Sequence, residues 1–336
     1  MMYFRWIKKE WFLLGMLFAI VLALLVPQWG RSGGYLHLDQ LTAIGIALIF
    51  FLHGLGLAPK EIKKGLFNWR LHLMVQATTF VVYPLLWVLF GDLLHALLPS
   101  ALAFGFCYLF ALPSTISSSV AMTSIAQGNV AGAVFNASLS SLLGVFITPL
   151  LVQLFMGGDG GAMDLMATVS SICQLLLLPM IIGQALRPLL LSLFQRYKGI
   201  LNKIDKLVIL LIVFNAFSDS VVEHIWGEFS PRYLLFSFLI SLLVLLSVVH
   251  SIRLVARLLD FNSADEIAAV FCGSKKTLAA GVPMAKVIFS ANPDLGMLLL
   301  PIMLYHPIQI FYCALLANRY AAAEKVKDLH QPVARG

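Results

Sequence analysis

Apolar runs recur along the chain from Leu13 almost to Ala317, separated by short polar segments. Each run is about 17–25 residues long, the length a helix needs to cross the hydrocarbon core of a bilayer. The pattern predicts an all-α polytopic membrane protein with ten transmembrane helices, at 11–27, 39–58, 70–90, 101–126, 130–156, 163–186, 207–225, 232–252, 264–289 and 295–317. Residues 1–336 then form a single membrane domain with a cytoplasmic tail at 318–336.

The composition also indicates a chain that lies almost entirely in a membrane. Hydrophobic residues make up 60% and charged residues 12% of the 336 positions, whereas soluble domains carry about 25% charged residues. Most of the 23 lysines and arginines face the cytoplasm if the N-terminus is placed inside, as the positive-inside rule requires. We therefore expect a bacterial inner-membrane protein with both termini cytoplasmic, and no nucleic-acid partner. The basic segment 187–206 is expected to be a loop along the inner surface.

The fourth predicted span is interrupted by polar residues. Pro113 lacks a backbone donor and disturbs a helix. The hydroxyl side chains that follow it belong to Ser114, Thr115, Ser117, Ser118 and Ser119. Non-helical backbone is tolerated at membrane depth only where it is buried in protein or faces water. The segment therefore predicts a broken helix that lines a cavity or a helix crossing.

The ninth predicted span contains Lys275 and Lys276 beside the small residues Gly273 and Ser274. Lys275 lies about 11 residues into the span, roughly 16 Å along a helix axis and close to the bilayer midplane. A charge at that depth costs at least about 2.5–3.5 kcal/mol, which indicates a functional role. Because adjacent residues do not share a helix face, we expect Lys276 and Thr277 to face a ligand and Lys275 to hold the crossing.

The two interrupted segments occupy matching positions in two halves of five spans each. A half with an odd number of spans returns inverted, so the pattern predicts a 5+5 inverted repeat with a transporter site at its interface. Weaker candidates for this site are Asn136, Ser138, Ser140, Ser141, Gln76, Thr79, Tyr305, His306 and Gln309. The chain has no catalytic or phosphate-binding motif, and its four cysteines are scattered, so we expect no enzyme activity, disulfide or cofactor.

Two segments carry a resemblance to a known family. Residues 112–151, LPSTISSSVAMTSIAQGNVAGAVFNASLSSLLGVFITPLL, resemble the fourth and fifth helices of the bile acid:sodium symporter superfamily. Residues 271–286, FCGSKKTLAAGVPMAK, resemble its SBF-like branch. The resemblance implies a panel domain and a core domain in which broken helices 4 and 9 cross. The panel would comprise 11–58 and 163–225, and the core 70–156 and 232–317.

The resemblance also implies sodium sites beside the crossing and an organic anion bound between panel and core. The family's sodium-binding motif in the ninth helix has a glutamate, then a glutamine and an asparagine. The best match here is Phe271, Lys275 and Lys276. The acidic ligand is missing and ammonium groups replace the neutral amides, so the lysines are expected to supply fixed charge in place of sodium.

We therefore expect a secondary transporter of a small organic anion that works by alternating access without the standard sodium sites. The ligand contacts would be Lys276, Thr277, Pro113, Ser114 and Thr115. The residues of the crossing and of ion coupling would be Lys275, Ser117, Ser118, Ser119, Asn136, Ser138, Gly273, Ser274 and Thr79. Sodium or a proton is the candidate coupling ion, and the protein would be a monomer or weak homo-oligomer in the lipid bilayer. The alternatives are a sodium-coupled symporter with rearranged sites and a non-transporting membrane regulator.

Overall fold

The structure is a computed structural model that describes residues 11–56, 67–156, 170–171, 173–224, 230–289 and 292–330. These residues form helices joined by turns, without a β-strand among them, as the apolar pattern predicts. The elements are α2 (Trp11–Leu25), α3 (Pro27–Gly30), α4 (Leu38–Gly56), α6 (Trp69–Ala77), the π-helical turn η1 (Thr78–Val82), α7 (Tyr83–Leu97), α8 (Ser100–Ala111), α9 (Ser117–Ile125), α10 (Val130–Met156), the π-helical turn η2 (Cys173–Leu177), α12 (Leu178–Val222), α13 (Pro231–Leu258), α14 (Ser263–Gly273), α15 (Leu278–Ile288) and α16 (Leu295–His330).

Several helices have the length and composition of membrane spans. Among the described residues, six stretches qualify: Leu38–Gly56, Trp69–Leu97, Val130–Met156, Cys173–Leu201, Pro231–Leu258 and Leu295–Ala323. The chain is therefore an integral membrane protein. The predicted spans 101–126 and 264–289 are each divided into two half-length helices. Each half is too short to be recognised as a membrane span by its length alone. Helix α16 continues into the predicted tail as far as His330.

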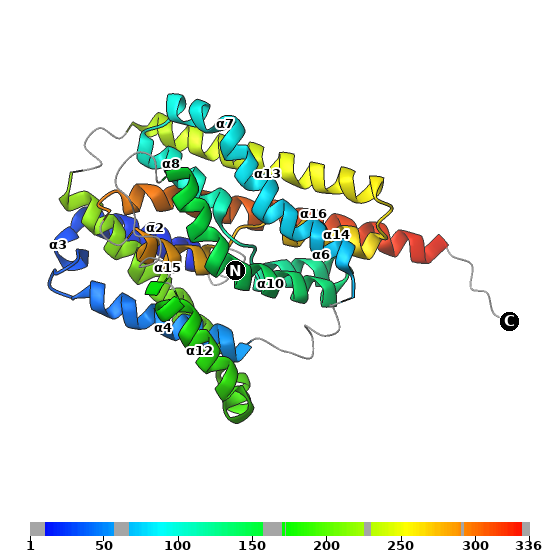
Figure 1. Cartoon of the computed structure of the whole chain (residues 1–336), viewed down its shortest axis with the longest axis horizontal. Coiled ribbons are helices and arrows are strands. Elements are labelled where there is room, and N and C mark those ends of the chain that lie inside the picture. Colours follow the sequence, from blue (N-terminus) through cyan, green and yellow to red (C-terminus); the bar gives the residue numbers. More distant parts are fainter. Residues whose placement is uncertain are drawn as a thin grey trace, which may run out of the picture.

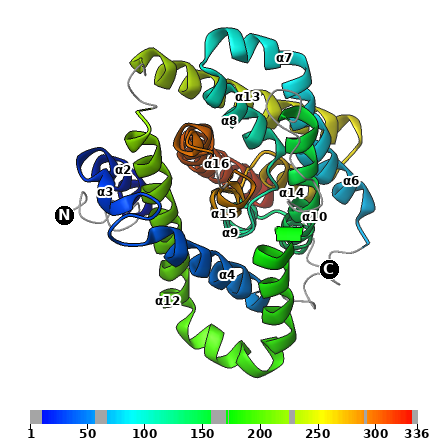
Figure 2. The same ribbon diagram turned by 60° about the vertical axis from the view of Figure 1, so that its left-hand side comes forward.

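The helices are arranged around α16. Helices α4 and α12 lie on one side of the molecule and α7 and α13 on the opposite side, with α16 between them (Figure 1, Figure 2). Helix α12 packs against α2, α4 and α16, whereas α16 also packs against α8 and α13. The side chains of α8 and α14 are nearly all buried, and large apolar side chains on α7 and α13, such as Val88 and Leu254, are exposed. Exposed apolar faces are what a bilayer requires of the outermost helices.

Residues 187–206 differ from the expected loop. They are helical, and α12 runs through them without interruption to Val222. Figure 2 shows that α12 is bent, so that its two arms pass opposite ends of α4. Pro188 lies inside the helix, and proline is a common cause of sharp helix kinks. The predicted spans 163–186 and 207–225 are thus connected by basic helix, while the predicted loop 157–162 lies outside the described residues.

Glycines allow α4 and α12 to approach closely. A Cβ atom added to Gly54 would lie 2.1 Å from the carbonyl oxygen of Met180, and one added to Gly183 would meet a carbonyl oxygen of α4 at the same distance. Toward the start of α4, Gly45 faces the side chain of Val208. Small residues that let two backbones approach are typical of helix contacts in membranes. These contacts hold both arms of the bent helix against α4.

Candidate functional site

The two interrupted segments meet where their helices break. The first break, Leu112–Ile116, separates α8 from α9, and the second, Ser274–Thr277, separates α14 from α15. The backbone N–H of Thr277 donates to the carbonyl oxygen of Pro113 at 3.0 Å. The predicted interruptions at Pro113 and at the lysine pair are therefore confirmed, and the two breaks are in direct contact.

Hydroxyl groups of the first break satisfy carbonyl groups at the end of α14. Ser114 Oγ donates to Cys272 O at 2.5 Å, and Ser119 Oγ donates to Phe271 O at 2.8 Å. Thr115 Oγ1 shares hydrogen bonds with the hydroxyls of Ser118 and Ser119. The last carbonyl groups of a helix have no partner within it, so these hydroxyls replace the missing helical bonds. The serine-rich sequence is explained by this requirement.

Lys276 occupies the centre of the crossing. Its side chain is fully buried, and its Nζ atom donates to three backbone carbonyl oxygens, those of Thr79 at 3.0 Å, Phe110 at 2.9 Å and Leu112 at 2.7 Å. The same ammonium lies 4.0 Å from the centre of the Tyr83 ring. A lysine ammonium has three N–H donors, so all of them are used. The carbonyl ends of α8 and the cation also attract one another through the helix dipole.

A proline and the first helix break free carbonyl groups that Lys276 binds. In the π-helical turn η1, the N–H of Tyr83 bonds to Thr78 O, and the next residue, Pro84, has no N–H to offer Thr79 O. At the end of α8, the N–H of Ser114 bonds to Ser140 Oγ at 2.9 Å instead of Phe110 O. Turns of π-helix are frequent at functional sites. Here the turn presents a carbonyl oxygen to a buried cation.

Two further groups fix the backbone of the second break. The side-chain amide of Gln309 accepts from Lys276 N at 2.9 Å and donates to Lys276 O at 2.8 Å. The phenol oxygens of Tyr83 and Tyr305 both lie within hydrogen-bond distance of Ser274 O, at 2.7 and 2.9 Å. Helix α16 therefore holds the backbone on both sides of Lys275.

Lys275 has a different environment. Its side chain is also fully buried, but its Nζ atom donates to one acceptor among the described residues, Ser118 O at 2.9 Å. The ammonium lies 5.5 Å from the centre of the Phe271 ring. Two of its three N–H donors are thus without an acceptor in the described part of the chain. Ser118 is half-buried and Ser117 is exposed at the start of α9, so Lys275 lies next to the accessible edge of the crossing.

The two lysines therefore differ in how many of their donors the protein uses. Lys276, the expected ligand contact, has all its donors bound to protein, whereas Lys275, expected to hold the crossing, has donors to spare. Pro113, Ser114, Thr115 and Thr277 are buried in the two breaks. Lys275 and Lys276 have different partners because the break between α14 and α15 turns neighbouring side chains in different directions.

The remaining predicted residues lie close to the crossing. Asn136 receives bonds from Gln76 Nε2 and donates to Gly132 O, so it joins α10 to α6. Ser138 is buried on α10. A Cβ atom on Gly273 would lie 3.0 Å from Ile252 Cδ1, which makes this glycine a close-packing position.

Comparison with known proteins identifies the family. Residues 10–322 match the SBF-like CPA transporter family. The chain belongs to this family. It is 43% identical over 311 residues to "Putative symporter YfeH" of Escherichia coli strain K12, with 92% of each chain covered. It is 30% identical over 318 residues to sodium/bile acid cotransporter 7 of Danio rerio, covering 92% of this chain and 93% of the relative. It is 33% identical over 322 residues to sodium/bile acid cotransporter 7-B of Xenopus laevis, with 92% and 91% covered.

This member of the SBF-like CPA transporter family is a membrane transporter rather than an enzyme, as the absence of catalytic motifs predicts. Sequence reasoning missed some residues of its crossing. Tyr83 is one, although a tyrosine followed by proline inside an apolar span was a usable signal. Thr148 is another, since its hydroxyl donates to Ala111 O at 2.8 Å. A single threonine in a long apolar helix has no sequence signal that distinguishes it.

A second polar contact joins α15 to α12. Lys286 Nζ donates to Asn215 Oδ1 at 2.6 Å, and Asn215 Nδ2 donates to Gly30 O at 2.8 Å. Asp219, one turn further along α12, accepts from the backbone N–H and the hydroxyl of Ser32 at 2.6 and 2.8 Å. The network links the broken-helix group to α12 and the turn after α3. Any relative movement of these two groups has to break the bond of Lys286.

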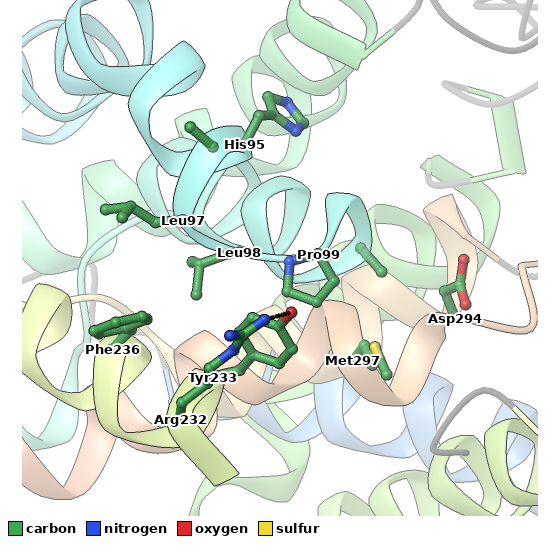
Figure 3. Close-up of a pocket in the computed structure, with 11 residues that line it drawn as sticks. His95, Leu97, Leu98, Pro99, Arg232, Tyr233, Phe236, Asp294 and Met297 are labelled. Carbon is green, nitrogen blue, oxygen red and sulfur yellow. Dashed lines mark hydrogen bonds between the residues drawn. The ribbon is translucent and has the colours of Figure 1, made fainter. Parts of the chain in front are cut away.

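A cavity of about 640 Å³ lies away from the crossing (Figure 3). It is bounded by the turn between α7 and α8, the start of α13 and the start of α16. Arg232 donates to the Tyr233 hydroxyl at 2.9 Å on its wall, and Asp294 lies at the other side of the view. Partial burial raises the pKa of Asp294 above its usual value. Because the cavity contains charges of both signs and does not reach the lysines, we do not place the transport site there.

Proposed function

We propose that this protein is a secondary transporter of an organic anion and that Lys275 is the anion contact. The observation that carries the proposal is the carbonyl cage around Lys276. A fixed ammonium there supplies the positive charge at the crossing, and the neighbouring Lys275 keeps donors for a ligand. Lys276 is then a permanent structural cation, and Thr79 and Ser118 provide carbonyl groups that hold the two ammonium groups apart.

The fixed charge argues against sodium at the same place. A sodium ion needs oxygen ligands, and the carbonyl oxygens of Phe110, Leu112 and Thr79 already bind an ammonium. Two unit charges 4 Å apart repel by roughly 4 kcal/mol at an effective dielectric constant near 20. Phe271 stands where the family resemblance calls for a carboxylate. The proposed transport is therefore sodium-independent, with a proton as the remaining candidate for coupling.

The proposed mechanism is alternating access in a 5+5 inverted repeat of ten spans. The panel comprises 11–58 and 163–225, and the core comprises 70–156 and 232–317. The contact of the two breaks supports this division, because broken helices from matching positions of two repeats form transporter sites. The distribution of basic residues favours the bacterial inner membrane with both termini in the cytoplasm.

A sodium-coupled symporter is the second candidate, since relatives at 30–33% identity are named sodium/bile acid cotransporters. A ligand-binding regulator that does not transport is the third. One experiment distinguishes these two candidates from the organic-anion transporter. It measures uptake and counterflow of a labelled bile salt in proteoliposomes, with sodium replaced by choline at constant ionic strength. We expect saturable counterflow without sodium, and its loss in Lys275→Met. A requirement for sodium would favour the second candidate, and binding without exchange would favour the regulator.

A further inference from the structure

Three basic side chains from three elements converge at the contact between α12 and the broken helices. Lys275 comes from the second break, His306 from α16 and Lys206 from the bent helix α12. His306 Nδ1 lies 3.2 Å from Gln309 Nε2, which also donates to the backbone carbonyl oxygen of Lys276, the residue next to Lys275. Lys206 and His306 are half-buried, so both are partly enclosed by protein and partly accessible.

Aromatic rings connect Lys206 to His306. The Lys206 ammonium lies 5.5 Å from the ring centre of Phe12 and 5.5 Å from that of Trp11. The Phe12 ring in turn meets the imidazole of His306 edge-on, with 6.3 Å between the ring centres. The group therefore has an apolar wall made by α2 and charged groups on either side of it.

Gln309 determines which nitrogen of His306 carries the proton. The N–H of Lys276 donates to Gln309 Oε1, which fixes the amide orientation and makes Nε2 the donor. That Nε2 lies 3.2 Å from His306 Nδ1, so Nδ1 is the acceptor and the neutral imidazole carries its proton on Nε2. The His306 Nε2–H is thus a further donor at the same place.

No carboxylate in the part of the chain that the structure describes pairs with the positive charges of this group. Within the described residues, the ion pairs join Glu266 to Arg253 and Arg257, and none involves Lys275, Lys206 or His306. Charged residues inside a membrane protein are normally paired or face a water-filled path for substrate or ions. Two ammonium groups and a neutral imidazole in one region of the protein match a ligand with two negative charges.

We infer that Lys206 and His306 form a second anion subsite and that the protein prefers organic dianions over monoanions. This rests on the proposed function of Lys275. One acidic group of the ligand binds the free donors of Lys275, the other binds Lys206, and the His306 Nε2–H donates between them. The apolar body of the ligand packs against Trp11 and Phe12.

The test measures binding of two matched probe pairs to the purified full-length protein. The pairs are taurolithocholate with taurolithocholate 3-sulfate, and octanoate with suberate, which differ within each pair in having one or two acidic groups. We expect the dianion of a pair to bind at least about tenfold more tightly, a difference of about 1.4 kcal/mol. Lys206→Met should remove this preference without changing monoanion affinity, and Lys206→Arg should keep it.

Lys203→Met is the control, because it removes the same charge at an exposed position one turn away on the same helix. It should leave the preference unchanged. Equal affinities of the wild type for mono- and dianions, or an unchanged preference in Lys206→Met, would overturn the second subsite while leaving the Lys275 site intact. Failure of all four probes to bind, or unaltered binding in Lys275→Met, would instead contradict the proposed function itself.

Discussion

At the scale of single residues, Lys276 shows how a membrane protein can keep a charge in its core. Three carbonyl oxygens replace the hydration of its ammonium, and each of them lacks a helical partner because a proline or a break removed it. The charge and the breaks are therefore mutually dependent. Without the ammonium the breaks would leave unsatisfied carbonyl groups, and without the breaks the ammonium would have no acceptors.

This dependence predicts different consequences for the two lysines. Lys276→Met leaves three buried carbonyl oxygens without donors and should lower the free energy of unfolding by at least about 3 kcal/mol, since an unsatisfied buried group costs about 1–3 kcal/mol. Lys275→Met removes one bond and a poorly compensated charge, so it should change stability by about 1 kcal/mol or less. Equilibrium unfolding in mixed micelles gives both values. A larger loss for Lys275→Met would contradict the assignment of roles.

The tyrosine pair gives a second prediction at this scale. The hydroxyl oxygens of Tyr83 and Tyr305 lie 2.7 and 2.9 Å from Ser274 O and 2.6 Å from each other. Two protons therefore serve three contacts, and either tyrosine can donate to Ser274 O. Either single change to phenylalanine leaves Ser274 O with one donor, so each should cost about 1 kcal/mol. The double variant leaves it with none, and its cost should exceed the sum of the single costs by about 1 kcal/mol. Additive unfolding energies in this double-mutant cycle would exclude the shared acceptor.

At the scale of elements, the bent helix α12 depends on backbone contacts with α4. Gly54 and Gly183 bring the two helices so close that carbonyl oxygens occupy the space of a side chain. The bend places basic helix between the two arms, where a loop was expected. Close approach of the two backbones at these glycines therefore contributes to positioning the elements of this region.

The glycine contact predicts that Gly183→Ala is strongly destabilising. Its Cβ would lie 2.1 Å from a backbone oxygen, and such overpacking costs about 1–3 kcal/mol or more. Gly199 is the matched control, because it lies in the same helix and a Cβ there meets nothing within 4 Å. Gly199→Ala should be neutral or stabilising by up to about 1 kcal/mol through helix propensity. Thermal melting measures both variants, and equal shifts in their melting temperatures would contradict this packing.

At the scale of the whole molecule, the bond from Lys286 to Asn215 joins the proposed core to the proposed panel. Alternating access requires these two bodies to separate on one side of the membrane at a time. Lys286 lies on α15, on the opposite side of the second break from α14, and Ser220 on α12 also donates to Pro293 O at 2.7 Å. We interpret these bonds as the closed outer side of the transporter.

Loss of the Lys286 bond should therefore favour an outward-open state. A charge-assisted hydrogen bond contributes about 1.5–3 kcal/mol, so Lys286→Met should raise the open population about ten- to a hundredfold. The buried position 216 on α12 reports this opening. In a variant without the four native cysteines, Ala216→Cys should react faster with a membrane-impermeant maleimide when Lys286→Met is present. Lys203→Met is the charge control, and equal labelling rates in all backgrounds would exclude an outer gate at Lys286.

The sequence by itself determined the all-helical membrane class, the family and the two helix breaks. Length, apolar runs, Pro113 and the lysine pair are local properties, and the cost of a charge in a bilayer does not depend on the details of packing. What only the tertiary structure decided is which atoms meet. The carbonyl groups around Lys276 come from α8 and η1, far from it in the sequence, and backbone acceptors have no residue signature. The helical course of 187–206, the different partners of Lys275 and Lys276 and the contact of Lys206 with Phe12 depend in the same way on directions that arise only when the helices pack.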